Sequence, residues 1–146
     1  MIRLLETHDV AAILAIQSAS PEIAQWTASD YARVARGEIA GWIAGEDETA
    51  TITGFLVARQ IAGDLEILNL AVRPDARRRG TGTELLRRSF AWGKSFGAAN
   101  ALLEVRAANL AALDFYRHHG FEIIGLRKRY YVAPSDDALV LRRILP

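Results

Sequence analysis

The residues around position 80 combine cationic side chains, glycines and a hydroxyl group in an order that suits anion binding. Between an apolar stretch and a run with helical periodicity lies the segment Arg77-Arg78-Arg79-Gly80-Thr81-Gly82. The first turn of a helix has backbone N–H groups without internal acceptors, and the helix dipole is positive there. Glycine lets the backbone approach a phosphate closely and adopt positive φ. The segment therefore predicts a cradle in which main-chain N–H groups hold a diphosphate.

Two related phosphate-binding motifs are excluded by the spacing. A P-loop needs lysine and then serine or threonine after its last glycine, whereas Thr83-Glu84 follows Gly82. A dinucleotide fingerprint needs a third glycine, which is absent. A solvated basic loop at a helix start remains an alternative. Contact with nucleic acid is disfavoured, because the formal net charge is only +1 and no aromatic residue lies among the arginines.

Two further side chains, Glu104 and Tyr116, are candidates for moving protons. A strand over 101–106 places Glu104 on one face with Leu102 and Arg106. A carboxylate among apolar neighbours can accept a proton, directly or through water, and a structural ion pair with Arg106 is the alternative. Tyr116 lies on a helix that starts at Asn109 and points toward the sheet. It is a candidate acid or hydrogen-bond donor, and a core tyrosine is the alternative.

Hydrophobic periodicity and turn residues predict the elements that position these groups. Strands are expected at 2–6, 42–43, 52–60, 65–72, 101–106, 121–131 and 138–144. Turns are expected at 46–49 and 133–137. Helices are expected to be capped by Thr7, by Thr27 or Ser29, by the Gly80–Gly82 segment and by Asn109. The order β-α-α-β-β-β-α-β-α-β-β predicts an α/β fold whose mixed sheet is covered by helices on both faces.

Composition limits the class of protein. The 146 residues are 51% hydrophobic and 24% charged, which predicts a single globular domain over 1–146. The longest apolar run, 10–16, is far shorter than the roughly 20 residues of a membrane span. Glu6 and Asp9 offset Arg3, so a secretory signal is not expected. The absence of cysteine excludes disulfides and thiolate chemistry, and it fits a reducing cytoplasm. The histidines lack the spacing of metal ligands, so no metal is expected.

Several motifs resemble one enzyme superfamily, the GNAT acyltransferases. Its motif A is similar to Arg77-x-x-Gly80-x-Gly82. The bacterial ribosomal-protein-alanine N-acetyltransferases (RimI type) have motifs that resemble Leu103-Glu104-Val105-Arg106-x-x-Asn109, Phe115-Tyr116, Gly125-x-Arg127-x-x-Tyr130-Tyr131 and Trp26-Thr27-x-x-x-Tyr31. The chain departs from that pattern at Gln25, where the family has proline, and at Ala108, where it has serine.

The resemblance implies a GNAT-type fold with a splay between strands 65–72 and 101–106, into which acetyl-CoA enters as co-substrate. It implies a diphosphate on Arg77, Arg78, Arg79, Gly80, Thr81, Gly82 and Thr83. The pantetheine arm would lie along Leu70, Ala71 and Val72 and near Asn109. A backbone N–H near Val72 would polarise the thioester carbonyl, Glu104 would act as base and Tyr116 as acid.

The implied acceptor is the N-terminal α-amine of a protein, alanine or a similar small residue, and by analogy a ribosomal protein. Trp26, Tyr130 and Tyr131 would line a slot for that residue, with sheet packing as the alternative for the tyrosines. No direct nucleic-acid or membrane partner is expected. Two alternatives remain: acetylation of a small amine or a protein lysine, and a non-catalytic acyl-CoA-binding module.

Overall fold

The computed structural model describes residues 1–37, 39–46 and 51–146. Strands and helices alternate in the expected order, with two short 3-10 helices, η1 and η2. The elements are β1 (Ile2–Leu4), η1 (Thr7–Asp9), α1 (Val10–Ser18), α2 (Ala28–Ala35), β2 (Ala40–Gly45), β3 (Ile52–Ile61), β4 (Asp64–Val72), η2 (Pro74–Ala76), α3 (Thr81–Ser95), β5 (Asn100–Arg106), α4 (Leu110–His118), β6 (Glu122–Val132) and β7 (Ser135–Ile144).

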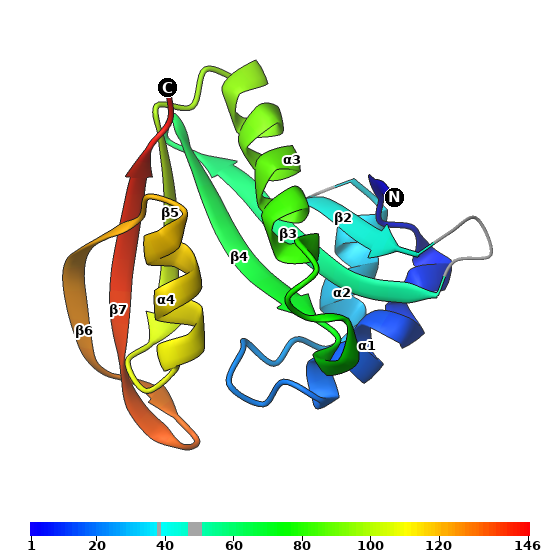
Figure 1. The fold of residues 1–146 in the computed structure, drawn as a ribbon, viewed down its shortest axis with the longest axis horizontal. Coiled ribbons are helices and arrows are strands. Elements are labelled where there is room, and N and C mark those ends of the chain that lie inside the picture. The colour runs from blue at the N-terminus through cyan, green and yellow to red at the C-terminus, as the bar shows by residue number, and fades with distance from the viewer. Residues whose placement is uncertain (38, 47–50) are drawn as a thin grey trace.

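One mixed seven-stranded sheet organises the molecule, in the order β1-β2-β3-β4-β5-β7-β6. Neighbouring strands are antiparallel except β4 and β5, which are parallel. Helices α1 and α2 lie on one face and α3 and α4 on the other (Figure 1). The expected α/β class, the antiparallel β2-β3-β4 meander and the helices on both faces are confirmed.

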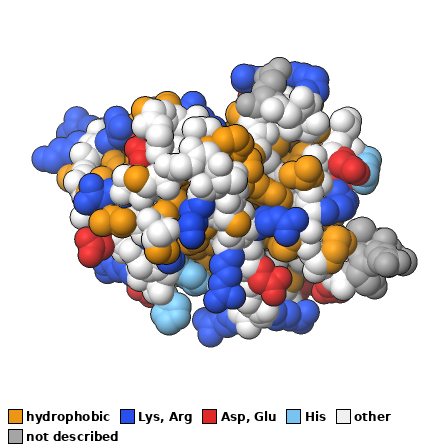
Figure 2. Space-filling view, turned by 90° about the horizontal axis from the view of Figure 1, so that it is seen from above, with side chains coloured by type: hydrophobic (Ala, Val, Ile, Leu, Met, Phe, Trp, Pro, Cys, Tyr) orange, Lys and Arg blue, Asp and Glu red, His pale blue; other side chains and the backbone are white. Residues whose placement is uncertain are grey.

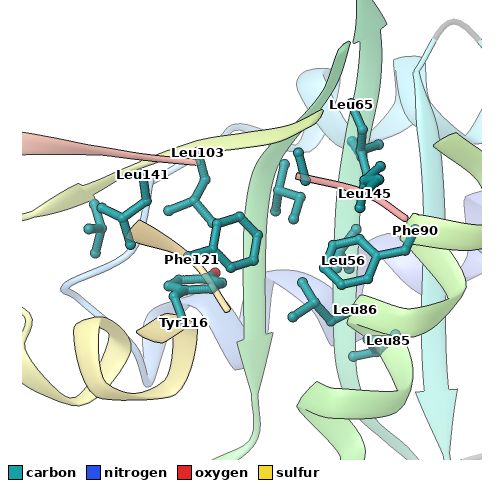
Figure 3. Packing of buried hydrophobic residues seen from close by; sticks show 14 of the residues in the cluster. Leu56, Leu65, Leu85, Leu86, Phe90, Leu103, Tyr116, Phe121, Leu141 and Leu145 are labelled. Atoms are coloured by element: carbon teal, nitrogen blue, oxygen red, sulfur yellow. The ribbon is translucent and has the colours of Figure 1, made fainter. Parts of the chain in front are cut away.

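Two hydrophobic clusters, one on each face, hold the helices to the sheet. The α3–α4 cluster includes Tyr116 and Phe121, whose rings lie 5.5 Å apart, centroid to centroid. Figure 3 shows this pair beside Leu103 and Leu141, with the α3 side chains packed near β3 and β4. The second cluster packs α1 and α2 against the other face. Burial on both faces explains why the central strands are rich in apolar residues.

Two local predictions need correction, at the first helical segment and at the last turn, and the choice between two caps for the second helix is decided. The first helical segment begins after Glu6 rather than Thr7, because the Glu6 N–H donates to the Asp9 carboxylate at 2.8 Å. The second helix is capped by Thr27, whose hydroxyl accepts from the Asp30 N–H at 3.1 Å, rather than by Ser29. Strand β7 already starts at Ser135, so the last turn is shorter than expected. Most of the turn expected at 46–49 lies outside the described residues.

The surface shows no strong segregation of charge on the face seen in Figure 2. Lys and Arg side chains are spread over that face, with hydrophobic groups between them. Among the residues that the structure describes, no helix has both the length and the apolar character needed to cross a bilayer.

Candidate active site

Strands β4 and β5 separate soon after they begin. They pair only at Leu65 with Ala101 and at Glu66 with Leu102. Beyond these pairs, β4 continues along β3 with a one-residue bulge at Leu68, and β5 continues along β7. A bulge bends a strand and sharpens its twist, which helps β4 diverge from β5. The splay expected between these strands is therefore present (Figure 1).

The splay exposes hydrogen-bonding groups on one edge of β4. The Arg73 N–H donates to the Thr53 carbonyl of β3 at 2.7 Å. Because the backbone groups of successive strand residues point to opposite edges, Ala71 also faces β3, whereas Leu70 and Val72 face the splay. Leu70 and Val72 can thus pair with a peptide-like ligand, as expected. The main-chain groups of Ala71 are directed at β3 rather than at the splay.

The turn before α3 presents a row of free amides. Arg78 and Gly80 both have positive φ, 64° and 81°, which curls the backbone ahead of the helix. The first helical bond runs from the Glu84 N–H to the Gly80 carbonyl at 3.0 Å. Among the described residues, no acceptor pairs with the main-chain N–H groups of residues 78–83. Successive unpaired amides at the start of a 15-residue helix fit a diphosphate.

Gly82 lets α3 lie close to α4 beside this turn. A Cβ at Gly82 would lie 3.1 Å from Cζ of Phe115 and 3.8 Å from Cγ2 of Val72. The glycine is therefore required by close approach rather than by its backbone conformation. Any larger side chain here must displace the Phe115 ring or enter the space next to the amide row.

The arginines of the turn do not act alike. Arg77 turns away from the helix: its Nε donates to the Val72 carbonyl at 3.0 Å and its Nη2 to Oγ of Ser20 at 3.0 Å. Nη1 of Arg79 lies 3.6 Å from a carboxylate oxygen of Glu46. Arg78 is exposed beside the amide row. Of the three guanidinium groups expected at the diphosphate, that of Arg77 is already committed to protein acceptors.

Thr83 is held by the end of α4. Its Oγ1 lies 2.9 Å from Nε2 of His119, whose Nδ1 lies 2.8 Å from the Phe115 carbonyl. Since a carbonyl only accepts, Nδ1 carries a proton and donates it to the Phe115 carbonyl, while Nε2 shares a hydrogen bond with the Thr83 hydroxyl. The side chain of Thr83 is therefore engaged within the protein, and its main-chain N–H remains available to a ligand.

Glu104 shares one face of β5 with Leu102 and Arg106, as its alternation predicted, and this face is opposite the one that packs against α4. Its side chain is 27% exposed, and its Oε1 lies 2.9 Å from Nε of Arg127. The expected apolar surroundings are wrong, because Arg127 and Tyr130 adjoin the carboxylate. The alternative of a Glu104–Arg106 pair is also wrong. The Arg106 guanidinium instead donates to the Pro134 carbonyl at 2.8 Å and lies 4.2 Å from the Tyr131 ring centroid.

Tyr130 and Tyr131 extend this polar face onto β6. The negative charge of Glu104, and a hydrogen bond to it, raise the pKa of Tyr130. A register shift between Arg127 and Tyr131, with Arg129 at a φ of 52°, interrupts the regular pairing of β6 with β7. Figure 1 shows this hairpin at the same end of the sheet as the loop between α1 and α2, which carries Trp26.

Tyr116 lies on α4, buried in the α3–α4 cluster. Its hydroxyl points toward β4 (Figure 3). Burial raises the pKa of Tyr116, since it penalises the phenolate. A raised pKa makes full proton transfer less favourable than from an ordinary tyrosine, so the hydroxyl is better suited to donating a hydrogen bond.

Asn109 caps α4 through its side chain. Its Oδ1 accepts from the Ala112 N–H at 3.2 Å. The carboxamide oxygen is thus engaged in starting the helix, and its NH₂ group is the part that can meet a cofactor arm.

Comparison with known proteins agrees with this geometry. The family model described as Acetyltransferase (GNAT) family matches residues 8–121, more than half of the chain. The chain belongs to the GNAT acetyltransferase family. The fold and the superfamily expected from motif A are thus confirmed.

The curated relatives of this GNAT protein include one that is uncharacterised and one that is named as an acetyltransferase. An uncharacterised protein of Mycobacterium leprae is 42% identical over 55% of the chain, and that match spans only 21% of the relative. A Bacillus subtilis protein, provisionally named [ribosomal protein bS18]-alanine N-acetyltransferase, is 28% identical over 96% of the chain and 92% of the relative. The RimI-type names expected from the later motifs are thus found among the relatives.

A solved structure supports the same assignment. The crystal structure of the ribosomal-protein-S18-alanine N-acetyltransferase from Escherichia coli superposes with a TM-score of 0.85 at 26% identity. The match covers 99% of this GNAT chain and 93% of the other chain. The similarity therefore extends to the last two strands, which lie beyond the family-model match.

Sequence reasoning missed a buried polar network behind the splay. Asn69 of β4 donates to the Tyr31 hydroxyl at 3.1 Å and to the Ala24 carbonyl at 3.0 Å. The Tyr31 hydroxyl donates to Oε1 of Gln17, which also accepts from the Trp26 N–H at 3.0 Å. The network ties the loop that carries Trp26 to β4. Its one signal in the sequence is an asparagine within the otherwise apolar stretch 67–72.

Two other features lie away from the splay. Glu6, His8 and Asp9 bring possible ligand atoms within 4.8 Å of one another, the one such group among the described residues. Asp9 is 1% exposed and already paired with Arg3 at 2.8 Å, so the group is explained as an ion-pair cluster.

A hollow of about 610 Å³ between α3, α4 and the end of β7 is lined by cationic residues, including Arg87, Arg142 and Arg143.

The raised pKa of Tyr116 predicts how folding stability depends on alkaline pH. At pH values below 10.0, the ordinary tyrosine pKa, Tyr116 is protonated in both the folded and the unfolded chain, so it does not make folding stability depend on pH. Above it the unfolded chain releases the proton first, so stability falls as pH rises. Melting temperatures measured from pH 8 to 11 should fall less steeply for Tyr116→Phe than for the native chain. An equally steep fall in the variant would contradict a neutral buried Tyr116.

Proposed function

We propose that this chain transfers an acetyl group from acetyl-CoA to the N-terminal α-amine of a protein. The first residue is alanine or a similar small residue, and the acceptor is a ribosomal protein. The observation that carries the proposal is the open edge of β4 at Leu70 and Val72, which lies between the free amide row and Glu104 of the neighbouring strand. The names of the Bacillus and Escherichia relatives support the choice of acceptor.

Acetyl-CoA would be held mainly by the backbone. The N–H groups of residues 78–83 fit its diphosphate, with the Arg78 and Arg79 side chains at the rim. The pantetheine amides fit the free groups of Leu70, the Val72 N–H is left for the thioester end of the arm, and the Asn109 NH₂ group lies on the α4 side. When bound, the cofactor supplies an activated acetyl group on a thioester.

The chain's own groups then handle charge and protons. Since the Val72 carbonyl is bonded to Arg77, the free group of Val72 at the splay is its N–H, which can stabilise negative charge on the thioester oxygen. Glu104 would accept a proton from the incoming ammonium, directly or through water. The Tyr116 hydroxyl would donate a hydrogen bond to the departing sulfur.

The acceptor would enter from the face that carries Glu104, Tyr130 and Tyr131, with Trp26 on the loop at the same end of the sheet. Residues 1–146 would act as one catalytic domain. Such an enzyme would meet its protein acceptor in the cytoplasm and would need neither a metal nor contact with nucleic acid or membrane.

The proton requirement favours an α-amine over a lysine. Deprotonating an α-amine of pKa near 8 costs about 1.4 kcal/mol at pH 7, whereas lysine near 10.4 costs about 4.6 kcal/mol. The single carboxylate of Glu104, which is already paired with Arg127, is adequate for the smaller cost of deprotonating an α-amine. We therefore place lysine acetylation second.

A peptide panel tests the proposal. Purified enzyme and acetyl-CoA are incubated with peptides that begin with alanine, with the same peptides blocked at the N-terminus, and with blocked peptides that contain lysine. Tandem mass spectrometry should place the acetyl group on the free α-amine and find blocked peptides unchanged. Equal acetylation of the blocked lysine peptides would contradict the N-terminal assignment.

A further inference from the structure

We infer that Arg77 is a positioning residue for the acceptor side of the site, although its sequence motif predicts a role at the cofactor. Its guanidinium joins two segments far apart in the chain. Nε donates to the Val72 carbonyl, five residues away, and Nη2 donates to Oγ of Ser20, 57 residues away, both at 3.0 Å. The inference rests on the proposed function for the identity of the acceptor.

The first contact fixes the end of β4. Val72 is the last residue of that strand, and its N–H is the free group proposed above to meet the thioester oxygen. A guanidinium bonded to the carbonyl of the same residue limits rotation of the backbone there. Arginine suits this task because its donors diverge in a rigid plane, so one side chain can satisfy two acceptors at fixed angles.

The second contact fixes the loop between α1 and α2. Ser20 is 1% exposed, so its hydroxyl is held inside the loop rather than in solvent. Asn69 of β4 holds the same loop at Ala24, and Gln17 of α1 holds it at Trp26. Arg77 and Asn69 thus tie the acceptor-side loop to the strand that lines the cofactor splay.

These contacts separate two roles within one short motif. Arg78 is exposed next to the amide row and can meet a diphosphate, whereas two donor groups of Arg77 are directed at protein acceptors. Loss of the Arg77 side chain should therefore release the loop and the end of β4 while leaving the amide row intact. Acceptor binding and turnover should respond more strongly than acetyl-CoA binding.

The test compares Arg77→Ala and Ser20→Ala with Arg78→Ala and with Arg88→Ala, which removes an exposed arginine of α3. Calorimetry with acetyl-CoA and steady-state kinetics with an alanine-initiated peptide give Kd, KM and kcat. We expect Arg77→Ala to raise the peptide KM by about tenfold with acetyl-CoA Kd within about twofold of native. Ser20→Ala should show the same split more weakly, Arg78→Ala should raise Kd, and Arg88→Ala should change neither constant.

Two additions keep the test decisive. Amide hydrogen exchange in residues 19–27 should speed up in Arg77→Ala, and this readout needs no acceptor, so it remains valid if the proposed activity is absent. Arg77→Lys, which retains the charge and can make one of the two bonds, should fall between native and Arg77→Ala, and it serves if the alanine variant does not fold. A rise in acetyl-CoA Kd equal to that of Arg78→Ala, with unchanged peptide KM and unchanged exchange, would overturn the inference.

Discussion

Glu104→Gln is expected to lower kcat by about 10²-fold while leaving the Kd for acetyl-CoA unchanged. Glutamine keeps the size of the side chain and can still accept a hydrogen bond from Arg127, which lies 2.9 Å from the carboxylate. It cannot take a proton from the incoming amine, and loss of a general base typically costs 10²–10⁴-fold. Steady-state kinetics with an alanine-initiated peptide, together with calorimetry on acetyl-CoA, measures both quantities.

The chain offers a matched control in Glu66 of β4. Its side chain is 28% exposed and lies 3.1 Å from Nη2 of Arg59, against 27% and 2.9 Å for Glu104 and Arg127. Glu66→Gln therefore removes a carboxylate of the same exposure and pairing from the adjacent strand. We expect a much smaller change in kcat. Equal losses in the two variants would show that general surface charge, rather than proton transfer at Glu104, sets the rate.

Gly82→Val is expected to raise the Kd for acetyl-CoA by at least about 10²-fold. A Cβ at this position already lies 3.1 Å from the Phe115 ring, so the two further methyl groups cannot fit without displacing the ring or filling the space beside the amide row. A ligand held by main-chain amides depends on that space, since its diphosphate must approach the backbone. Isothermal titration with acetyl-CoA measures the loss.

Gly93→Ala is the control for crowding on the same helix. A Cβ there lies 3.1 Å from Cβ of Leu65, as tight as at Gly82, but it faces the core away from the amide row. This variant should lower the melting temperature with little change in Kd for acetyl-CoA. If Gly82→Val binds acetyl-CoA with native affinity while circular dichroism shows that its helices are intact, the cofactor binds elsewhere.

The fold was predictable to a large extent because its signals are local. Turn glycines such as Gly63, at a φ of 83°, and caps such as Thr27 mark where elements end and begin. Alternation in 101–106 placed Glu104 on one face with Leu102 and Arg106, opposite Leu103 and Val105, which the structure confirms. The splay itself came from the resemblance of the motifs, since no local pattern states how far two parallel strands remain paired.

The partners of the site residues were less predictable because they lie far apart in the chain. Arg77 and Ser20 are separated by 57 residues, and Asn69 and Ala24 by 45. Likewise, the pairing of Glu104 with Arg127 rather than Arg106 depends on the register of β5, β7 and β6. The direction of the Ala71 backbone follows from the β3–β4 register, which alternation of side chains alone does not reveal.

A crystal structure with bound acetyl-CoA tests the central claim most directly. The diphosphate oxygens should lie within hydrogen-bond distance of the N–H groups of residues 80–83, and the thioester oxygen should face the Val72 N–H. The pantetheine arm should run between β4 and β5. Cofactor density in the basic hollow lined by Arg87 and Arg142, together with no cofactor density between β4 and β5, would contradict the claim.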